Sequence, residues 1–277
     1  MVASDIMAGT MMGILAAALV AAGTARADAP DPKVRADLES LARRSVYFGH
    51  QSVGWNIIDG LKALSAREGV PLRIEEVKGR LEVPPGTFAH GPVAENGKPD
   101  MKLASFTSAL GSGVPSPAEV AFMKFCYVDF NAGTDAASLF ARYQSTLADL
   151  KARNPGTTFV HVTVPLTTAQ GGWKALVKRA MGKTPGGYAE NARRQEFNDL
   201  MRRTYQGKEP LFDLAAVEST APDGSRAEVE WEGKMVPVLF EGYTDDGGHL
   251  DKAGQLRAAR ELLAALARLP APPAGGK

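Results

Sequence analysis

A serine, an aspartate and a histidine stand in loops where their side chains could carry out acyl chemistry together. Ser52 follows a predicted strand and precedes a predicted helix, so its hydroxyl can project from the edge of a sheet. Asp246 precedes His249 by three residues, and the two glycines between them allow a tight turn. The carboxylate could then hold the histidine tautomer whose Nε2 is free to deprotonate a serine hydroxyl.

Each of these loops also has a simpler interpretation. Ser52 could act only as the N-cap of the helix that follows it. The acid, the glycines and His249 could contact calcium or zinc, but too few other ligand-type residues cluster in that loop to favour a metal. We therefore expect no metal ion and no organic cofactor.

The composition is that of an ordinary globular protein. The chain has 277 residues, of which 44% are hydrophobic and 23% charged, enough for one sizeable core and one domain. Lys and Arg number 32 against 31 Asp and Glu. The net charge of +1 gives no electrostatic reason to expect nucleic acid or an anionic membrane surface as a partner.

The N-terminal region predicts export. An apolar run at residues 11–23 precedes Ala25-Arg26-Ala27, a small-x-small site typical of signal-peptide cleavage, although no Lys or Arg precedes the run. The run is shorter than the roughly 20 residues of a membrane span. We expect a signal peptide at residues 1–27, no permanent membrane span, and a periplasmic or secreted location. Cys126, the only cysteine, lies in an apolar run and is expected to be a buried thiol that forms no disulfide.

After the signal, short apolar runs alternate with helical patterns, which is typical of βαβ units. The predicted fold is a three-layer α/β/α sandwich with a mostly parallel, five-stranded, flavodoxin-like sheet over residues 28–269, followed by a disordered tail at 270–277. Strands are expected at 45–49, 72–77, 120–128, 158–164 and 211–214. Helices are expected at 33–44, 53–68, 100–110, 134–153, 188–205 and 251–269.

Three segments have a weaker pattern. Residues 79–100 are rich in Pro and Gly and are expected to form a working loop without regular structure. Residues 170–187 are expected to be flexible, and residues 218–240 to form a hairpin-like insertion. Because loops at the carboxyl ends of parallel strands share one edge of the sheet, we expect the Ser52 and His249 loops to meet there.

The chain resembles the SGNH hydrolase superfamily, also called GDSL-type esterases, over most of the mature sequence. The segment Asp246-Gly247-Gly248-His249-Leu250 matches the last block of that family, and this is the most specific signal. Asn131 stands where the family has an oxyanion asparagine. The first block departs from the pattern, because His50-Gln51-Ser52 replaces Gly-Asp-Ser.

The resemblance implies a serine ester hydrolase that cleaves small acyl esters, such as an acetyl group on a carbohydrate. Ser52 would attack the ester carbonyl, His249 would relay the proton, and Asp246 would orient the imidazole. The oxyanion would be held by the Ser52 N–H, a second-block glycine and Asn131. Gly97 is our choice for that glycine, and Gly91 is left open.

Three polar residues near these loops, His50, Asn96 and Lys102, are assigned to substrate binding. A structural hydrogen bond is the alternative for His50, and solvated surface is the alternative for the other two. Lys124 lies in an otherwise apolar strand and needs either a carboxylate partner such as Asp129 or an edge position that reaches water.

Two other functions stay open. The same three residues could transfer an acyl group to a glycan hydroxyl if the pocket excludes water, which would make the chain an O-acyltransferase. Alternatively, the altered first block could mark a non-catalytic glycan-binding domain. Trp173 and Trp231 lie in irregular segments, where they could stack on a sugar or pack a loop. The sequence does not predict an oligomeric state.

Overall fold

The computed structural model describes residues 30–77, 81, 83–111 and 118–270. The predicted signal peptide and the predicted tail beyond residue 270 lie outside these residues. The chain divides into two compact units at Asp31, and the unit from Pro32 onward contains every element described below. Within the described residues, none of the helices has the length and apolarity needed to cross a membrane.

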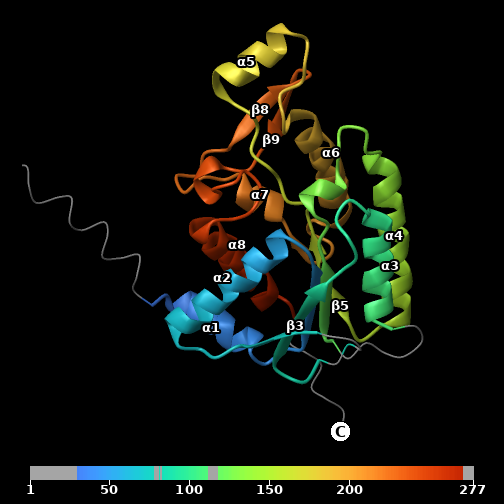
Figure 1. The fold of residues 1–277 in the computed structure, drawn as a ribbon. Helices are drawn as coiled ribbons and strands as arrows, with labels where there is room; N and C mark the ends of the chain where they lie inside the picture. The colour runs from blue at the N-terminus through green and yellow to red at the C-terminus, as the bar shows by residue number, and fades with distance from the viewer. Residues whose placement is uncertain (1–29, 78–80, 82, 112–117, 271–277) are drawn as a thin grey trace, which may run out of the picture. The chain divides into compact units, whose positions relative to one another are not determined.

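A parallel sheet lies at the centre of the unit (Figure 1). Its strand order is β2-β3-β1-β4-β5, with β1 in the middle. In this register Gly49 of β1 lies between Gly91 and Met123 of the neighbouring strands. The strand bounds are Val46–His50 for β1, Arg73–Glu76 for β2, Thr87–Pro92 for β3, Val120–Met123 for β4 and Thr158–Phe159 for β5. A second parallel pair joins β6 (His161–Val162) to β7 (Leu211–Phe212).

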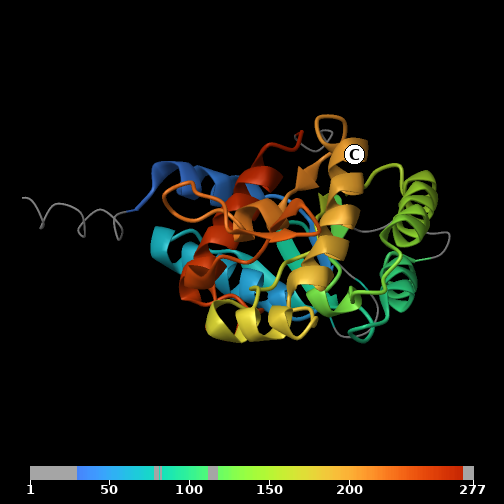
Figure 2. The same ribbon diagram turned by 90° about the horizontal axis from the view of Figure 1, so that it is seen from above.

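Helices cover both faces of the sheet, as Figure 2 shows from above. Successive side chains of β1 point to opposite faces, so that Phe48 packs in one core and Tyr47 in the other. The predicted three-layer α/β/α fold is therefore confirmed. On one face lie α1 (Pro32–Leu41), α2 (Val53–Glu68) and α8 (Lys252–Ala267), and on the other lie α3 (Pro99–Ala109), α4 (Ala136–Arg153) and α6 (Tyr188–Tyr205).

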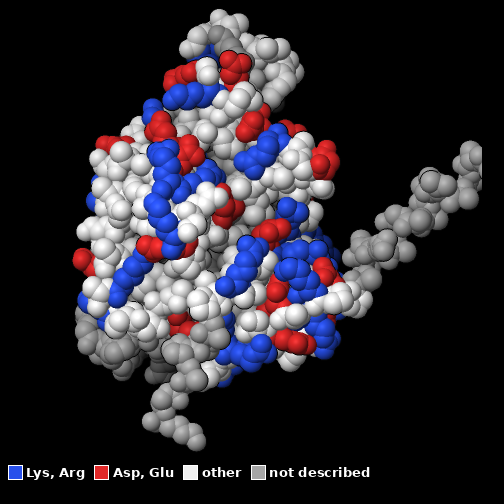
Figure 3. All heavy atoms as spheres, turned by 180° about the vertical axis from the view of Figure 1, so that it is seen from behind, with Lys and Arg blue, Asp and Glu red and all other residues white. Residues whose placement is uncertain are grey.

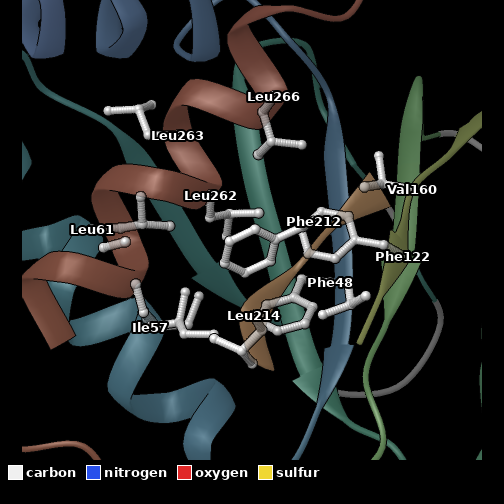
Figure 4. Packing of buried hydrophobic residues seen from close by; sticks show 14 of the residues in the cluster. Phe48, Ile57, Leu61, Phe122, Val160, Phe212, Leu214, Leu262, Leu263 and Leu266 are labelled. Carbon is white, nitrogen blue, oxygen red and sulfur yellow. The ribbon is translucent and has the colours of Figure 1, made fainter. Parts of the chain in front are cut away.

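The contact between α2 and α8 brings two distant parts of the chain together. Figure 4 shows Ile57 and Leu61 of α2 close to Leu262 of α8, on one face of the sheet. A Cβ on Gly60 would lie 2.3 Å from the backbone oxygen of Gln255, so the helices approach here as only glycine allows. Because α2 follows Ser52 and α8 follows His249, this contact brings their two loops to the same end of the sheet.

The prediction that residues 79–100 lack regular structure was wrong, because β3 forms within them at Thr87–Pro92. It pairs with β2 on one side and β1 on the other. Its residues up to Gly91 are buried, but they are small or polar in part and give no clear apolar run. Tertiary pairing, rather than local propensity, makes this segment a strand.

Several predicted elements have different bounds. The strand predicted at 120–128 ends at Met123, and Tyr127–Asp129 form a short 3-10 helix where the Asp129 carboxylate accepts from the Cys126 N–H. The strand predicted at 158–164 divides at Val160, whose N–H donates to Ala121, because His161 turns to pair with β7. The strand predicted at 211–214 ends at Phe212 and leads into α7 (Leu214–Glu218).

The two irregular segments also contain regular elements. Residues 170–187, predicted to be flexible, hold helix α5 at Gly172–Ala180. The predicted hairpin within 218–240 is present as β8 (Glu228–Trp231) and β9 (Lys234–Pro237), which pair antiparallel. On the face that Figure 3 shows, Lys and Arg lie among Asp and Glu, as the net charge of +1 leads one to expect.

Candidate active site

Ser52 lies at a strained turn between β1 and α2. Its φ of 51° and ψ of −114° lie in a region that residues other than glycine rarely adopt. The turn is packed tightly on both sides: a Cβ on Gly49 would lie 2.7 Å from Val93, and a Cβ on Gly54 would lie 2.4 Å from the His50 ring. The two glycines that flank the serine therefore let the sheet and the helix close around it. Such strand-to-helix turns display a nucleophile at the sheet edge.

The loop before α8, which contains Asp246 and His249, forms a tight turn around the carboxylate of Asp246. Its Oδ1 accepts from the N–H groups of Gly248 and His249, at 2.8 and 2.7 Å. Gly247 has a φ of 84°, and a Cβ there would lie 2.6 Å from the Thr168 hydroxyl oxygen. A Cβ on Gly248 would lie 2.9 Å from the Tyr127 ring. Both glycines of the Asp-x-x-His segment are thus required by conformation or by close packing.

The structure brings Ser52, His249 and Asp246 into one line of hydrogen bonds. The Ser52 Oγ lies 2.7 Å from His249 Nε2, and His249 Nδ1 lies 2.7 Å from Asp246 Oδ2. Because an ionised carboxylate only accepts, Nδ1 carries the proton and Nε2 accepts from the serine hydroxyl. The hydrogen bonds from the His249 side chain and from the two backbone N–H groups hold the pKa of Asp246 well below its ordinary value. The carboxylate therefore stays ionised at neutral pH, and the line can activate a serine hydroxyl.

Two residues that the sequence analysis did not single out hold this loop against the serine turn. Asn56, in the first turn of α2, accepts through Oδ1 from the Leu250 N–H at 3.1 Å. The Tyr127 ring meets the His249 ring edge to face, with centroids 5.8 Å apart. Burial raises the pKa of the Tyr127 phenol. Asn56 could have been found from the sequence, because it is a polar residue four positions after Ser52. Tyr127 could not, because it lies in an apolar run that was predicted to be a strand.

Lys124 supports the serine turn from beneath. It is buried, and its Nζ donates to the backbone oxygen of Gln51 at 2.8 Å. Burial lowers the pKa of this ammonium to about 8. A second hydrogen bond runs from Nζ to the Phe125 oxygen at 3.3 Å, and none of the ion pairs found in the described residues joins Lys124 to a carboxylate. Neither the predicted carboxylate partner nor the predicted edge position is therefore correct, because the buried ammonium donates to backbone carbonyls.

His50 lies behind Ser52, inside the protein. Its Nε2 lies 3.0 Å from His90 Nδ1, and its side chain is buried. Burial, together with the nearby charge of Lys124, lowers the pKa of His50 to about 2. The ring is therefore neutral and packed under the turn, which corresponds to the structural alternative and not to substrate contact.

The second-block glycine Gly97 and the residues assigned to substrate binding, Asn96 and Lys102, are linked around the buried carboxylate of Asp129. The Gly97 N–H donates to Asp129 Oδ1 at 2.7 Å, and Lys102 Nζ donates to Asp129 Oδ2 at 2.7 Å. Lys102 is fully buried and also donates to Asn96 Oδ1 at 2.8 Å. The Gly97 N–H is therefore already engaged, and the Lys102 ammonium lies in the interior, whereas Asn96 is an exposed residue. Gly91, the other candidate, lies within β3 beside Gly49.

Asn131 makes its hydrogen bonds within its own loop. Its Oδ1 accepts from the Gly133 N–H at 2.8 Å, and its own N–H donates to the Thr134 hydroxyl at 2.9 Å. No hydrogen bond in the described residues joins it to Ser52 or His249. By contrast, none of the hydrogen bonds found in these residues uses the Ser52 N–H, which leaves it able to donate to a ligand.

Metal-ligating side chains do not gather in the part of the chain that the structure describes, where no three His, Cys, Asp or Glu are close enough to hold an ion. Cys126 is buried, as predicted.

Comparison with known proteins gives similarity in structure alone. No protein-family model matches the chain, and no curated protein is significantly similar in sequence. A Streptococcus pneumonia protein linked by name to platelet activating factor has a TM-score of 0.49 and 13% identity, covering 85% of this chain and 92% of that one. A peptidoglycan O-acetylesterase has a TM-score of 0.47 and 11% identity, covering 85% and 94%.

A GDSL-like lipase from Bacteroides thetaiotaomicron has a TM-score of 0.46 and 13% identity, covering 86% of this chain and 90% of that one. Since the identities are at most 13% and the TM-scores lie below 0.5, we argue the function from the geometry of the site.

Proposed function

We propose that this chain is a serine ester hydrolase of the SGNH type, with Ser52 as nucleophile, His249 as general base and Asp246 as the residue that orients the imidazole. The observation that carries the proposal is the unbroken line from Ser52 Oγ through His249 to Asp246, with both distances at 2.7 Å. The strained conformation of Ser52 supports it, because an ordinary helix N-cap adopts an extended conformation and needs no positive φ.

In the proposed reaction Ser52 Oγ attacks the ester carbonyl while His249 Nε2 accepts the hydroxyl proton. The tetrahedral intermediate collapses to an acyl-serine, and the imidazolium gives its proton to the departing alcohol. A water molecule, deprotonated by the same Nε2, then releases the acid and restores the serine. Asp246 stabilises the imidazolium of both steps, since it is ionised and hydrogen-bonded to Nδ1.

The developing oxyanion needs donors that are not already engaged. We propose the Ser52 N–H as the first donor. The Asn131 side chain is a second donor only if its loop moves, because Oδ1 is held by Gly133 in the present conformation. Gly97 is left out of the proposed oxyanion hole, since its N–H donates to Asp129.

The openness of the site favours hydrolysis over acyl transfer. The side chains of His249 and Asp246 are 46% and 56% exposed, so water can reach an acyl-serine at this position. An O-acyltransferase would have to exclude that water. The proposed substrate is a small acyl ester, such as an acetyl group on a carbohydrate, which rests on the SGNH resemblance and on the predicted export of the chain.

A chromogenic acetate ester tests the proposal directly. We expect turnover by the wild-type chain and none above background by Ser52→Ala, while Ser145→Ala, which alters an exposed serine on α4, leaves turnover unchanged. Product release that rises when a glycan acceptor is added would indicate an acyltransferase. Absent turnover together with retained glycan binding would refute the enzyme and indicate a binding domain.

A further inference from the structure

Helix α5 exposes a continuous apolar face. The side chains of Trp173, Leu176 and Met181 are 69%, 66% and 61% exposed, and Val177 is 45% exposed. These positions follow the spacing i, i+3, i+4 and i+8. The first three lie on one side of α5 (Gly172–Ala180), and Met181 directly follows the helix, with its N–H donating to the Val177 oxygen at 3.0 Å as in a further helical turn. The other large apolar side chains that the described residues expose, Met101, Val128 and Met235, are far from these in the sequence. A clustered apolar face of this kind is typical of a surface that binds something.

The position of α5 leaves this face accessible. Figures 1 and 2 both show α5 on the outside of the unit, away from the central sheet. Thr168, four residues before the helix, donates its N–H to the Gly247 oxygen at 2.9 Å. The segment that leads into α5 is therefore hydrogen-bonded to the Asp246–His249 turn. A ligand of α5 would bind on the side of the molecule where this turn lies.

The charge of this segment is one-sided, unlike that of the whole chain. Residues 171–187 contain Lys174, Lys178, Arg179 and Lys183, and there is no Asp or Glu between Asp149 and Glu190. The net charge of +1 for the chain hides this local excess of positive charge. A short helix with Trp and Leu on one face, in a segment whose charged residues are all basic, matches the pattern of helices that lie in the interface of an anionic membrane.

We propose that α5 docks flat on an anionic lipid bilayer, with the exposed residues Trp173, Leu176 and Val177 of the helix and Met181 just beyond its end in the interface, and that the positive charge of the segment attracts it to the lipid headgroups. A second copy of the chain fits less well, because a symmetric contact would place two positively charged segments against each other. The proposal goes beyond the proposed esterase activity and does not depend on it.

Vesicle flotation tests this docking with the chain that begins at Asp28, which omits the apolar run at residues 11–23 and keeps the compact unit that begins at Pro32. We expect the wild-type chain to float with vesicles of phosphatidylglycerol and phosphatidylcholine and to remain below vesicles of phosphatidylcholine alone. Binding should weaken with added salt. The double variant Leu176→Ser/Met181→Ser should lower the affinity at least tenfold, whereas Met101→Ser/Val128→Ser, which removes apolar side chains elsewhere, should not.

Tryptophan fluorescence gives an independent measurement. The emission of the wild-type chain should shift to shorter wavelength on addition of the anionic vesicles, and Trp173→Phe should abolish the shift while Trp55 and Trp231 continue to emit. Equal loss of binding in both double variants, absence of wild-type binding to the anionic vesicles, or a dimer that Leu176→Ser/Met181→Ser dissociates would each overturn the proposal.

Turnover of a water-soluble acetate ester separates the two proposals. Leu176→Ser/Met181→Ser should turn over this ester as the wild-type chain does, because none of the hydrogen bonds or ring contacts that the described residues make with Ser52 and His249 comes from α5. Loss of vesicle binding with unchanged turnover would therefore show that docking and catalysis are distinct, and vesicle binding by a chain without turnover would leave the docking proposal standing.

Discussion

The substitution Asp246→Asn isolates the orienting role of the carboxylate. An asparagine has the same shape, and its Oδ1 can accept from the N–H groups of Gly248 and His249, as the carboxylate does at 2.8 and 2.7 Å. The turn should therefore persist. The position of Oδ2, 2.7 Å from His249 Nδ1, is taken by an amide that donates. The imidazole must then carry its proton on Nε2, where it can no longer accept one from Ser52.

The expected decrease in kcat is large, because His249 Nε2 can no longer accept the Ser52 proton. The wrong tautomer lowers kcat by about 10⁴-fold in enzymes with a buried carboxylate. Since Asp246 is 56% exposed here, water can replace part of its effect, and we expect a loss of roughly 10³-fold, or about 4 kcal/mol in the activation free energy. KM should change little, because no part of the substitution contacts substrate in the proposed mechanism.

Steady-state hydrolysis of a chromogenic acetate ester measures this loss. Asp245→Asn is the matched control, since Asp245 is the exposed neighbour of Asp246 and takes no part in the line of hydrogen bonds. The control should keep the wild-type kcat. A kcat for Asp246→Asn within tenfold of wild type, in a protein with an unchanged unfolding temperature, would refute the assigned role of Asp246.

Three further substitutions test the supports of the site and the fold. Asn56→Ala removes the acceptor for the Leu250 N–H and should lower the kcat of ester hydrolysis about fivefold, which corresponds to ~1 kcal/mol, with little change in the unfolding temperature. Gly60→Ala places a Cβ 2.3 Å from the Gln255 oxygen and should lower the free energy of unfolding in urea by about 1–3 kcal/mol. Burial raises the pKa of Glu218 to about 8, so the folded state keeps a proton that the unfolded state loses, and the wild-type free energy of unfolding should fall as pH rises from about 5 to 8. Glu218→Gln should flatten that slope by up to ~1.4 kcal/mol per pH unit in urea titrations, and an unchanged slope would contradict the raised pKa.

Local sequence patterns were sufficient to predict the bounds of two long helices. The bounds of α2 and α6 agree with the predicted 53–68 and 188–205, because apolar residues recur at helical spacing in both. Gly69 ends α2 with a φ of 66°, as a C-terminal glycine cap should. Such signals lie within a few residues of the element that they define.

Strand β3 shows the limit of local patterns. Its segment Thr-Phe-Ala-His-Gly-Pro follows Pro84-Pro85-Gly86 and itself ends in glycine and proline, and only its place between β2 and β1 makes it a strand. The predicted substrate residue Lys102 was misjudged for the same reason. Its partner Asp129 lies 27 residues away, so that burial of the pair depends on contacts that no local pattern shows.

The candidate site could be predicted in part from the sequence. Ser52, Asp246 and His249 could be chosen from their loops, because a strand-to-helix turn and an Asp-Gly-Gly-His segment are visible in the sequence. The distance between Ser52 and His249, 197 positions apart, depends on the packing of α2 against α8. The support from Lys124 to the Gln51 oxygen likewise depends on the way β4 passes beneath the serine turn.

Covalent labelling of Ser52 tests the central claim most directly. The wild-type chain would be treated with a fluorophosphonate, which reacts with activated serine hydroxyls, and then digested and mapped by mass spectrometry. We predict that a single equivalent attaches to Ser52 and that labelling is lost in His249→Ala, whose serine lacks its base. Labelling at another serine, or labelling of Ser52 at the same rate without His249, would contradict the account.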